Sequence, residues 1–543
     1  MNKKLLSRLA PGLFAVVLFT ACRPAATVKG NLDVIPQPQE IVLARDTTPF
    51  MIVYPATNEK MHRTADFLAT FIKEMTGTEV RVSDKEKSSN AIILAVDSTM
   101  GHPEGYKLQI TPEKVLLTGG SEAGVFYGIQ TIHKALPILK DGKVAAALPA
   151  GTVTDFPRFR YRGFMIDVGR HFFPVSYLKQ MIDLMALHNI NYFHWHLTED
   201  QGWRIEIKKY PKLTEIGSKR DSTIIDWETK KFDGKPHSGF YTQDEAREIV
   251  RYAADRFITV VPEIDLPGHT TAALASYPEL GCTGGPYKVL CSFGVFPDVL
   301  CAGNDQTLQF TKDVLDEIMD IFPSEYIHIG GDECPKSRWE KCPKCQAKIK
   351  ELGIKALPKH SKENQLQTYF MSELEKEINA HGRRMLGWDE VLEGGLTPNS
   401  TIMSWRGIQG GIEAARQHHD VIMTPIQRLY FSNPRINKMT GFEWMNRVYN
   451  FEPVPAELTD AEKKFVIGTQ GCIWTEWTAD STKMEWQILP RMAALSEIQW
   501  TLPEHKNFER FMERLPEMLK IYSSLDYGYR EDVFAADTLK THK

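Results

Sequence analysis

Eight short apolar segments, separated by longer stretches with helical periodicity, constrain the fold of this chain more than any other feature. In order along the sequence they read RGFMIDV, INYFHWHL, FITVVPEIDL, YIHIGGDE, RRMLGWDE, STIMSW, DVIMTP and FVIGTQGCIW. Short apolar runs that end in polar residues are typical of buried parallel strands. The stretches between them, such as PVSYLKQMIDLMALHN, carry apolar residues three and four apart, as helices do. This alternation predicts an α/β fold, a (β/α)8 TIM barrel over residues 156–505, with a helical tail at 506–543.

A smaller unit precedes the barrel, at residues 34–155. FMIVYP, AIILAV and YKLQITPEKVLLTG are typical of strands, whereas RTADFLATFIKEMTG and AGVFYGIQTIHKAL have helical periodicity. We therefore expect an α+β domain with helices on one side of its sheet. The segment TVTDFPRFRYRG, with its proline, marks the boundary to the barrel, and no residue of the smaller unit indicates catalysis.

The first 22 residues are typical of an export signal, with Lys3 and Lys4 before an apolar stretch too short to span a bilayer comfortably. Their end, LFTAC, resembles the lipobox of bacterial lipoproteins. We therefore expect Cys22 to carry a lipid, with residues 23–33 as a tether at the outer membrane of the cell envelope. The alternative is an ordinary cleaved signal peptide. The sequence leaves open whether the protein faces the periplasm or the cell surface.

Charge and cysteine usage limit the partners. Lys and Arg number 65 against 69 Asp and Glu, so the chain has no basic field to hold nucleic acid. Seven cysteines remain after Cys22, and in an oxidising compartment we predict a structural disulfide between Cys282 and Cys301. Three more lie close together in CPKSRWEKCPKC: Cys334, Cys342 and Cys345. A metal site there is disfavoured because no fourth ligand lies nearby in the sequence, so we expect no metal and no cofactor.

Polar and aromatic residues gather where the apolar runs end. The carboxyl ends of barrel strands converge on one mouth, so these residues are predicted to share a pocket. They are Asp167, Arg170, His171, His194, His196, Glu199, Asp200, Glu263, Asp265, His269, Asp332, Glu333, Trp388, Asp389, Glu390, Trp405, Arg406, Trp474 and Glu476. Tryptophan faces stack on sugar rings, and carboxylates and guanidinium groups bind sugar hydroxyls. The pattern predicts a carbohydrate ligand.

The segment HWHLTED admits a second interpretation. His194 and His196 alternate along a strand and so face one side, where an acidic residue could complete a metal site. The other strand ends offer acids and tryptophans rather than further histidines in a ligand pattern. We therefore favour histidines held by carboxylates as supporting groups.

Asp332 and Glu333 stand side by side after Gly330 and Gly331. Adjacent strand residues face opposite sides, so the strand has to end here for both to enter one pocket, and the glycines allow that. Two neighbouring carboxylates cannot both ionise easily, so one pKa should rise and supply a general acid. Most glycosidases place their two carboxylates on different strands, whereas Asp332 and Glu333 follow the same strand.

Six blocks account for the pair: RGFMIDVGRHF, HWHLTEDQGWRIEI, PEIDLPGHT, IHIGGDE, GWDE and GCIWTEW. In these residues and their order the chain resembles family 20 glycoside hydrolases, the β-N-acetylhexosaminidases, and residues 34–150 resemble that family's N-terminal domain. The resemblance implies a retaining exo-acting hydrolase that removes terminal GlcNAc or GalNAc from glycans. The nucleophile then belongs to the substrate, whose 2-acetamido oxygen forms an oxazoline-type intermediate.

The resemblance also implies roles for individual residues. Glu333 matches the general acid/base, Asp332 the group that orients the acetamido N–H, and Tyr430 the hydroxyl donor to the acetamido oxygen. The remaining matches are Arg162 for hydroxyls O3 and O4, Glu476 for a further hydroxyl, Trp388, Trp405 and Trp474 for the pocket walls, and Asp200 with His269 as a pair supporting Glu333.

One position departs from the family pattern. Where the family often has Tyr-x-Asp, this chain has YFSN, so Ser432 replaces an acid expected to contact outer hydroxyls. We hypothesise that Asn433 or Arg435 replaces that contact and that Arg435 tolerates a 6-sulfated sugar. The competing function is a non-catalytic glycan-binding lipoprotein on the same barrel, which would not need Asp332, Glu333 and Tyr430 together.

Overall fold

The computed structural model describes residues 31–537 apart from 44–50, 56–57, 86–89, 140–142, 146, 396 and 434–437. The predicted signal, Cys22 and Arg435 lie outside the described residues. Within them, no helix is both long and apolar enough to cross a membrane.

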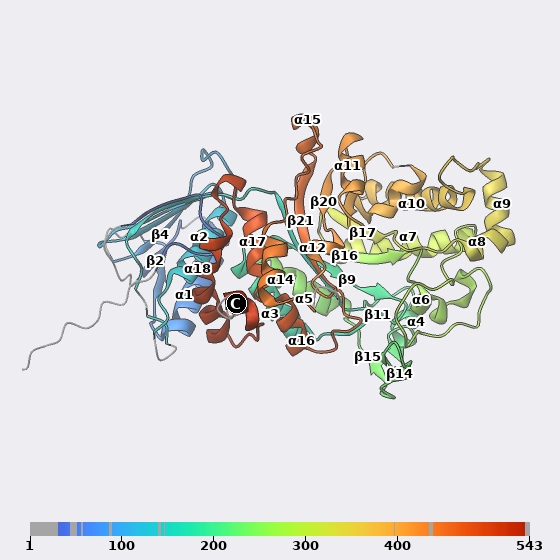
Figure 1. Cartoon of the computed structure of the whole chain (residues 1–543), viewed down its shortest axis with the longest axis horizontal. Coiled ribbons are helices and arrows are strands. Elements are labelled where there is room, and N and C mark those ends of the chain that lie inside the picture. Colours follow the sequence, from blue (N-terminus) through green and yellow to red (C-terminus); the bar gives the residue numbers. More distant parts are fainter. Residues whose placement is uncertain are drawn as a thin grey trace, which may run out of the picture.

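Eight parallel strands form a closed barrel (Figure 1). They are β8 (Tyr161–Asp167), β9 (Tyr192–His196), β16 (Thr259–Leu266), β17 (Tyr326–Gly330), β18 (Arg384–Trp388), β19 (Thr401–Ser404), β20 (Val421–Met423) and β21 (Val466–Ile473). The barrel closes where β21 pairs with β8, with Gly468 opposite Tyr161. Each strand coincides with one of the predicted apolar runs, which confirms the (β/α)8 fold.

Helices surround the barrel (Figure 1). The longer ones are α3 (Val175–Leu187), α5 (Gln243–Ala254), α7 (Asp305–Ile321), α10 (Lys362–Ala380), α11 (Gln409–Arg416), α14 (Gly441–Tyr449), α16 (Ser481–Ile488), α17 (Arg491–Trp500) and α18 (Phe508–Ser524). Helix α5 shows how the sequence specifies them, because Thr242 and Glu245 form a capping box and Ala246, Ile249 and Ala253 form its buried side.

Short elements fill the connections. The helices among them are α4 (Lys212–Glu215), α6 (Thr271–Ser276), η1 (Pro278–Leu280), α8 (Ser337–Lys341), α9 (Pro343–Glu351), η2 (Asp389–Gly394), α12 (Ile426–Leu429), α15 (Asp460–Lys463), η3 (Pro503–His505) and η4 (Asp532–Asp537). The strands are β10 (Thr198–Glu199), β11 (Gly202–Trp203), β12 (Lys219–Arg220), β13 (Ile224–Asp226), β14 (Lys231–Phe232) and β15 (His237–Ser238).

The smaller unit contains a seven-stranded sheet in the order β1-β7-β5-β6-β4-β2-β3. Its strands are β1 (Glu40–Leu43), β2 (Met51–Val53), β3 (Arg81–Ser83), β4 (Ile92–Val96), β5 (Tyr106–Ile110), β6 (Val115–Gly119) and β7 (Gly151–Asp155), and its helices are α1 (Glu59–Thr76) and α2 (Glu122–Ala135). The segment interpreted as a boundary therefore includes strand β7, which pairs with β1 and β5. Both predicted helices are present.

Helix α2 joins the two units. Almost all of its residues are buried, as expected of a helix covered on both sides. Its Lys134 donates a hydrogen bond of 2.9 Å to the carbonyl of Leu187, at the end of barrel helix α3. The smaller unit thus packs on the base of the barrel, meaning the end where the strands begin, and leaves the mouth free.

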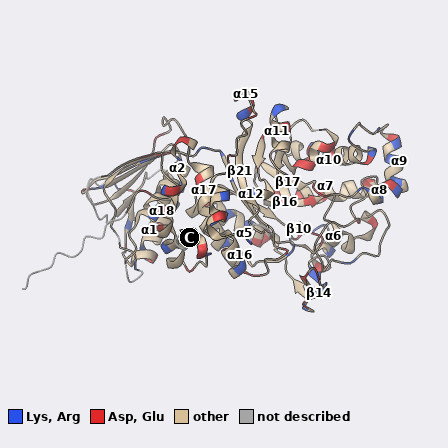
Figure 2. Ribbon diagram, in the orientation of Figure 1, with Lys and Arg blue, Asp and Glu red and all other residues tan. Residues whose placement is uncertain are grey.

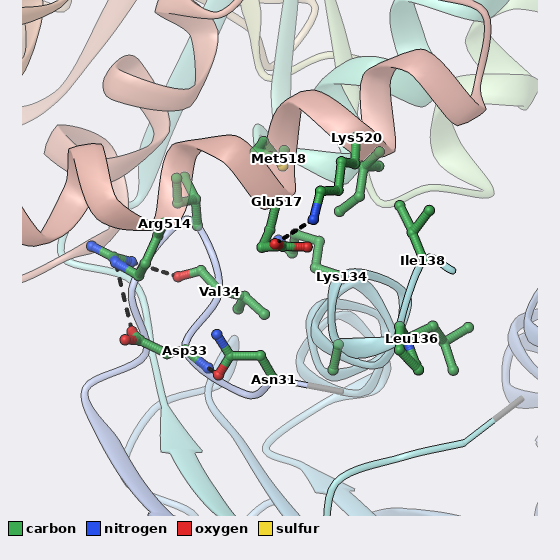
Figure 3. A pocket seen from close by; sticks show the side chains of 14 residues that line it. Asn31, Asp33, Val34, Lys134, Leu136, Ile138, Arg514, Glu517, Met518 and Lys520 are labelled. Atoms are coloured by element: carbon green, nitrogen blue, oxygen red, sulfur yellow. Dashed lines mark hydrogen bonds and ion pairs between the residues drawn. The ribbon is translucent and has the colours of Figure 1, made fainter. Parts of the chain in front are cut away.

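The N-terminal segment and α18 also meet at the base. Together with the end of α2 they enclose a pocket of about 310 Å³ (Figure 3). Arg514 of α18 donates to the carbonyl of Val34 at 2.6 Å, and Asn31 lies at the pocket's edge. The described chain therefore starts at the base of the barrel.

Charged residues are mixed over the molecule. Lys and Arg alternate with Asp and Glu along the outer helices, without a continuous region of one sign (Figure 2). This distribution agrees with the near-zero charge balance of the sequence.

Candidate active site

A pocket of about 250 Å³ opens at the mouth of the barrel. This volume is small for a ligand pocket and suits one sugar residue. The pocket is lined by Arg170, Asp332, Glu333, Trp405, Ile426, Tyr430, Ser432, Asn433, Trp474, Glu476 and Trp477. The structure thus brings together six of the predicted site residues: Asp332, Glu333, Tyr430, Trp405, Trp474 and Glu476.

Strand β17 ends in a sharp turn that directs two adjacent acids into this pocket. Gly330 and Gly331 have φ values of 65° and 98°, which favour glycine. A Cβ on Gly330 would lie 1.8 Å from Oδ1 of Asp265, so no larger residue fits. Glu333 itself has a φ of 42°, an uncommon conformation for a residue with a side chain. The backbone therefore leaves the alternation of a strand, and both carboxylates reach one site.

Asp332 is 9% exposed, and its Oδ1 has no hydrogen-bond partner within the described part of the chain. A buried carboxylate oxygen without a partner is rare, because leaving it unpaired costs free energy. Burial raises the pKa of Asp332 to about 6, and the charges of Glu263 and Glu333 act in the same direction, whereas His269 opposes them. The raised pKa therefore belongs to Asp332, which the resemblance assigns to the acetamido N–H rather than to proton donation. The free oxygen is suited to accept an N–H from a ligand.

Glu333 is backed by the predicted supporting pair. Nε2 of His269 lies 3.5 Å from Oε2 of Glu333, and Nδ1 of His269 lies 3.1 Å from Oδ2 of Asp200. Burial lowers the pKa of His269. The charge of Glu199 and hydrogen bonds with three carboxylates raise it by more, so the pKa lies well above its ordinary value. An imidazolium held between Asp200 and Glu333 supplies positive charge next to a candidate acid/base group.

Aromatic side chains form the opposite wall. The rings of Trp405 and Tyr430 are nearly parallel with centroids 6.0 Å apart, and Tyr430 lies 5.8 Å from Trp474. Burial raises the pKa of Tyr430 well above its ordinary value, so its hydroxyl stays protonated and can donate a hydrogen bond. Ser432, at the position of the departure from the family pattern, accepts a hydrogen bond from the Trp474 amide at 3.1 Å.

Trp388 lies beneath the pocket rather than in its wall. It is fully buried, its centroid is 5.8 Å from that of Trp474, and its Nε1 donates to Glu263 at 2.8 Å. Around the same carboxylate, Nε2 of His194 lies 2.9 Å away and Nδ1 of His328 3.1 Å away. The histidines of HWHLTED are therefore held by carboxylates, which agrees with the supporting role favoured from the sequence.

The predicted position of Arg162 in the pocket is wrong. Arg162 is the second residue of β8 and lies at the base of the barrel, fully buried. Its guanidinium donates to both carboxylate oxygens of Glu104, at 2.9 and 3.0 Å, and also to carbonyls and to Tyr127. Strand residues advance about 3.3 Å each, so one end of β8 is about 20 Å from the other.

The arginine of the pocket is Arg170, just beyond the other end of β8. It is 8% exposed, pairs with Glu199 at 2.6 Å and lies over the ring of Trp474. Its Nε has no hydrogen-bond partner in the described chain. The sequence already placed Arg170 at a strand end, and the rule that barrel sites form at the carboxyl ends of strands would have selected it.

Two more residues complete the site. Trp477 is 40% exposed at the rim and lines the pocket with its neighbour Glu476. Glu390 accepts a hydrogen bond of 2.8 Å from Nε1 of Trp405, and burial together with the charges of Asp332 and Asp389 raises its pKa to about 8. Glu390 was among the residues predicted to share the pocket. Trp477, the last residue of the motif GCIWTEW, was not singled out, because the motif does not tell which of its positions face the pocket.

The predicted disulfide between Cys282 and Cys301 is wrong. All seven described cysteines are free. Loop spacing alone suggested the pair. The fold brings two further cysteines to the same place, so the sulfur of Cys301 also lies 3.7 Å from that of Cys342 and 3.6 Å from that of Cys345.

Comparison with known families agrees with this geometry. Residues 159–503 match the model of the glycosyl hydrolase family 20 catalytic domain, and residues 31–156 match that of glycosyl hydrolase family 20, domain 2. A β-hexosaminidase of Porphyromonas gingivalis is 42% identical over 500 residues, which cover 89% of this chain and 62% of that protein. A β-hexosaminidase of Vibrio furnissii is 33% identical over 482 residues, which cover 87% of this chain and 77% of that protein.

Solved structures agree as well. The exo-β-N-acetylglucosaminidase of Vibrio harveyi, solved with N-acetylglucosamine, superposes with a TM-score of 0.80 at 29% identity, over 94% of this chain and 80% of that one. The β-N-acetylhexosaminidase of Streptomyces coelicolor A3(2) superposes with a TM-score of 0.78 at 28% identity, over 93% and 98%. The chain matches both family models in order, forms the expected closed barrel and carries two adjacent acids at the barrel mouth. This chain therefore belongs to glycosyl hydrolase family 20.

Proposed function

We propose that the protein is a retaining exo-β-N-acetylhexosaminidase that hydrolyses terminal GlcNAc or GalNAc by substrate-assisted catalysis. The observation that carries the proposal is the unpartnered Oδ1 of Asp332 next to Glu333. An acetamido N–H would satisfy that oxygen. Both acids come from one turn, whereas the two carboxylates of an ordinary retaining glycosidase lie on opposite sides of the scissile bond.

In the first step the substrate supplies its own nucleophile. Asp332 accepts the acetamido N–H and Tyr430 donates to the acetamido oxygen, so that oxygen is held against the anomeric carbon. The C1–O bond to the leaving group breaks as the bond from the acetamido oxygen to C1 forms. Glu333 gives its proton to the departing oxygen. The carboxylate of Asp332 stabilises the positive charge that develops on the oxazoline-type ring.

In the second step Glu333 acts as a base. It takes a proton from a water molecule, whose oxygen forms a bond to C1 as the bond to the acetamido oxygen breaks. Two displacements at C1 retain the configuration. Nε2 of His269 lies 3.5 Å from Glu333, so a positive charge stands beside the group that receives this proton.

The side chains that line the pocket suit an N-acetylhexosamine. Trp405 and Trp474 offer faces for the acetamido methyl and the sugar ring, while Arg170 and Glu476 offer groups for hydroxyls. A small pocket that suits one residue supports action at chain ends. We include in the proposal the export of the protein and its lipid anchor on Cys22, which rest on the sequence.

The proposal is tested with aryl β-GlcNAc and β-GalNAc substrates. For a poorly activated leaving group, Glu333→Gln should lower kcat by about 10² to 10⁴, because proton donation to that group is lost. Asp332→Asn should cause a loss of similar order on all leaving groups. Glu517→Gln, in helix α18 at the base of the barrel, is the matched control and should keep full activity.

A glycan-binding protein without activity predicts a different outcome. It would bind GlcNAc with all three variants and release no product with the unmodified chain. Full activity of both active-site variants would contradict the mechanism, and cleavage of β-glucosides that lack the acetamido group at an equal rate would exclude substrate assistance.

A further inference from the structure

Four cysteines from three separate segments meet beside the barrel mouth. Cys282 follows η1, Cys301 precedes α7, and Cys342 and Cys345 lie at the start of α9. Their four sulfur atoms all lie within 4.8 Å of one another. Cys282 and Cys301 lie 3.9 and 3.6 Å from Cys345, and Cys301 lies 3.7 Å from Cys342.

These spacings match a tetrahedron of thiolates around one ion. A Zn–S bond of about 2.3 Å gives sulfur–sulfur edges of about 3.8 Å in a tetrahedral site. A disulfide would need a separation of about 2.05 Å. The sulfur of Cys301 is almost equally far from two others, whereas a disulfide would single out one of them.

The surroundings suit a closed cluster of metal ligands. Cys342 is the N-cap of α9 and Cys345 lies in its first turn, where the helix dipole stabilises negative charge. Three of the cysteines are at most 4% exposed, so the cluster is closed on most sides.

We propose that Cys282, Cys301, Cys342 and Cys345 form a structural zinc site. Four thiolates leave no open position for a substrate or water, which distinguishes a structural site from a catalytic one. The pair Cys342 and Cys345 has the Cys-x-x-Cys spacing common in such sites. The other two ligands, Cys282 and Cys301, come from segments more than 40 residues earlier, which is why the sequence did not reveal the site. Cys334 is not part of the cluster.

The site would join the loops that follow strands β16 and β17. The Leu300 amide donates to the carbonyl of Pro267, two residues before His269, and the Trp339 indole donates to the carbonyl of Leu300. A Cβ on Gly303 would lie 2.4 Å from the Cys345 backbone, so the two segments pack in direct contact. The ion would therefore fix the loops that carry His269 and Glu333 without contacting the sugar.

The test is the metal content of the full-length protein, purified from the compartment to which cells export it and without chelator. We expect about one zinc per chain by elemental mass spectrometry, with release on titration by a mercurial thiol reagent. Reconstitution with Co²⁺ should give the strong visible bands of tetrahedral thiolate coordination. Cys282→Ser, at the least buried ligand, should lose the zinc or release it to chelator at least about tenfold faster.

A matched variant separates this site from general thiol effects. Cys291→Ser changes a partly exposed cysteine outside the cluster and should keep the zinc. A chain without zinc would overturn the proposal. Non-reducing peptide mapping would then show whether Cys301 is bonded to Cys342 or Cys345, and alkylation would show whether all four thiols are free. Zinc that remains in full in both Cys282→Ser and Cys342→Ser would overturn it as well.

Discussion

The two ends of strand β8 carry two buried arginines in opposite situations. At the base, every donor of Arg162 that is buried has a protein acceptor, and the fork on Glu104 joins the two units. At the mouth, Nε of Arg170 has no hydrogen-bond partner among the described residues, and Arg170 lines the same pocket as Asp332, whose Oδ1 also has none. A satisfied buried charge serves the fold, whereas an unsatisfied one marks a place for a ligand.

The same substitution at both ends should give the largest contrast. Arg170→Lys keeps the positive charge opposite Glu199 but loses the planar fork, and we expect kcat/KM to fall by about 10². The expected change in thermal stability is small by comparison. Initial rates with an aryl β-GlcNAc and a thermal unfolding scan measure the two effects, and an unchanged kcat/KM would remove Arg170 from the site.

Arg162→Lys is the counterpart at the base. It leaves Glu104, Tyr127 and two carbonyls short of donors, and we expect a loss of about 3 kcal/mol in unfolding free energy. The kcat/KM of the folded protein should be unchanged. Denaturant unfolding and rates normalised to folded protein test this, and a large kinetic effect would restore the original assignment of Arg162 to the substrate.

The two arginines, Arg162 and Arg170, also show how much of the fold and the site the sequence can predict. All eight barrel strands were recognisable, because buried parallel strands are apolar along their whole length. Asp332, Glu333, Asp200 and His269 follow strand ends and were predicted to meet. Arg162 was misplaced because a motif match does not say which end of a strand a residue occupies. The partners of Cys301 were missed because they depend on how distant loops pack.

Acid should reveal the raised pKa of Asp332. The carboxylate form is the stronger acceptor for the acetamido N–H and carries the charge that stabilises the oxazoline-type ring. The pKa of about 6 means that this form is lost as the pH falls through that value. We expect kcat/KM to drop about tenfold for each pH unit below about 6. Rates and GlcNAc binding by calorimetry, measured from about pH 4 to about pH 8, check this. Equal binding at both extremes would contradict the role given to Asp332.

The smallest effect is expected at the rim. Trp477→Ala removes a half-exposed face next to Glu476, so KM should rise by about threefold to tenfold while kcat is retained. Trp227 is 50% exposed and lies outside the pocket lining, so Trp227→Ala is the control and should leave both constants unchanged. Steady-state rates on a disaccharide substrate distinguish the two variants.

Asn31, where the described chain starts, lies at the base of the barrel. Its position limits how far the barrel can stand from a lipid on Cys22 and which end of the barrel faces that lipid. Nine residue steps separate it from Cys22, and an extended chain covers about 30 Å over that length. With the proposed lipid on Cys22, the enzyme would stand within that height of the bilayer with its base toward the lipid. Its mouth would then face outward, toward glycans that arrive from the surrounding medium rather than those rooted in the same membrane.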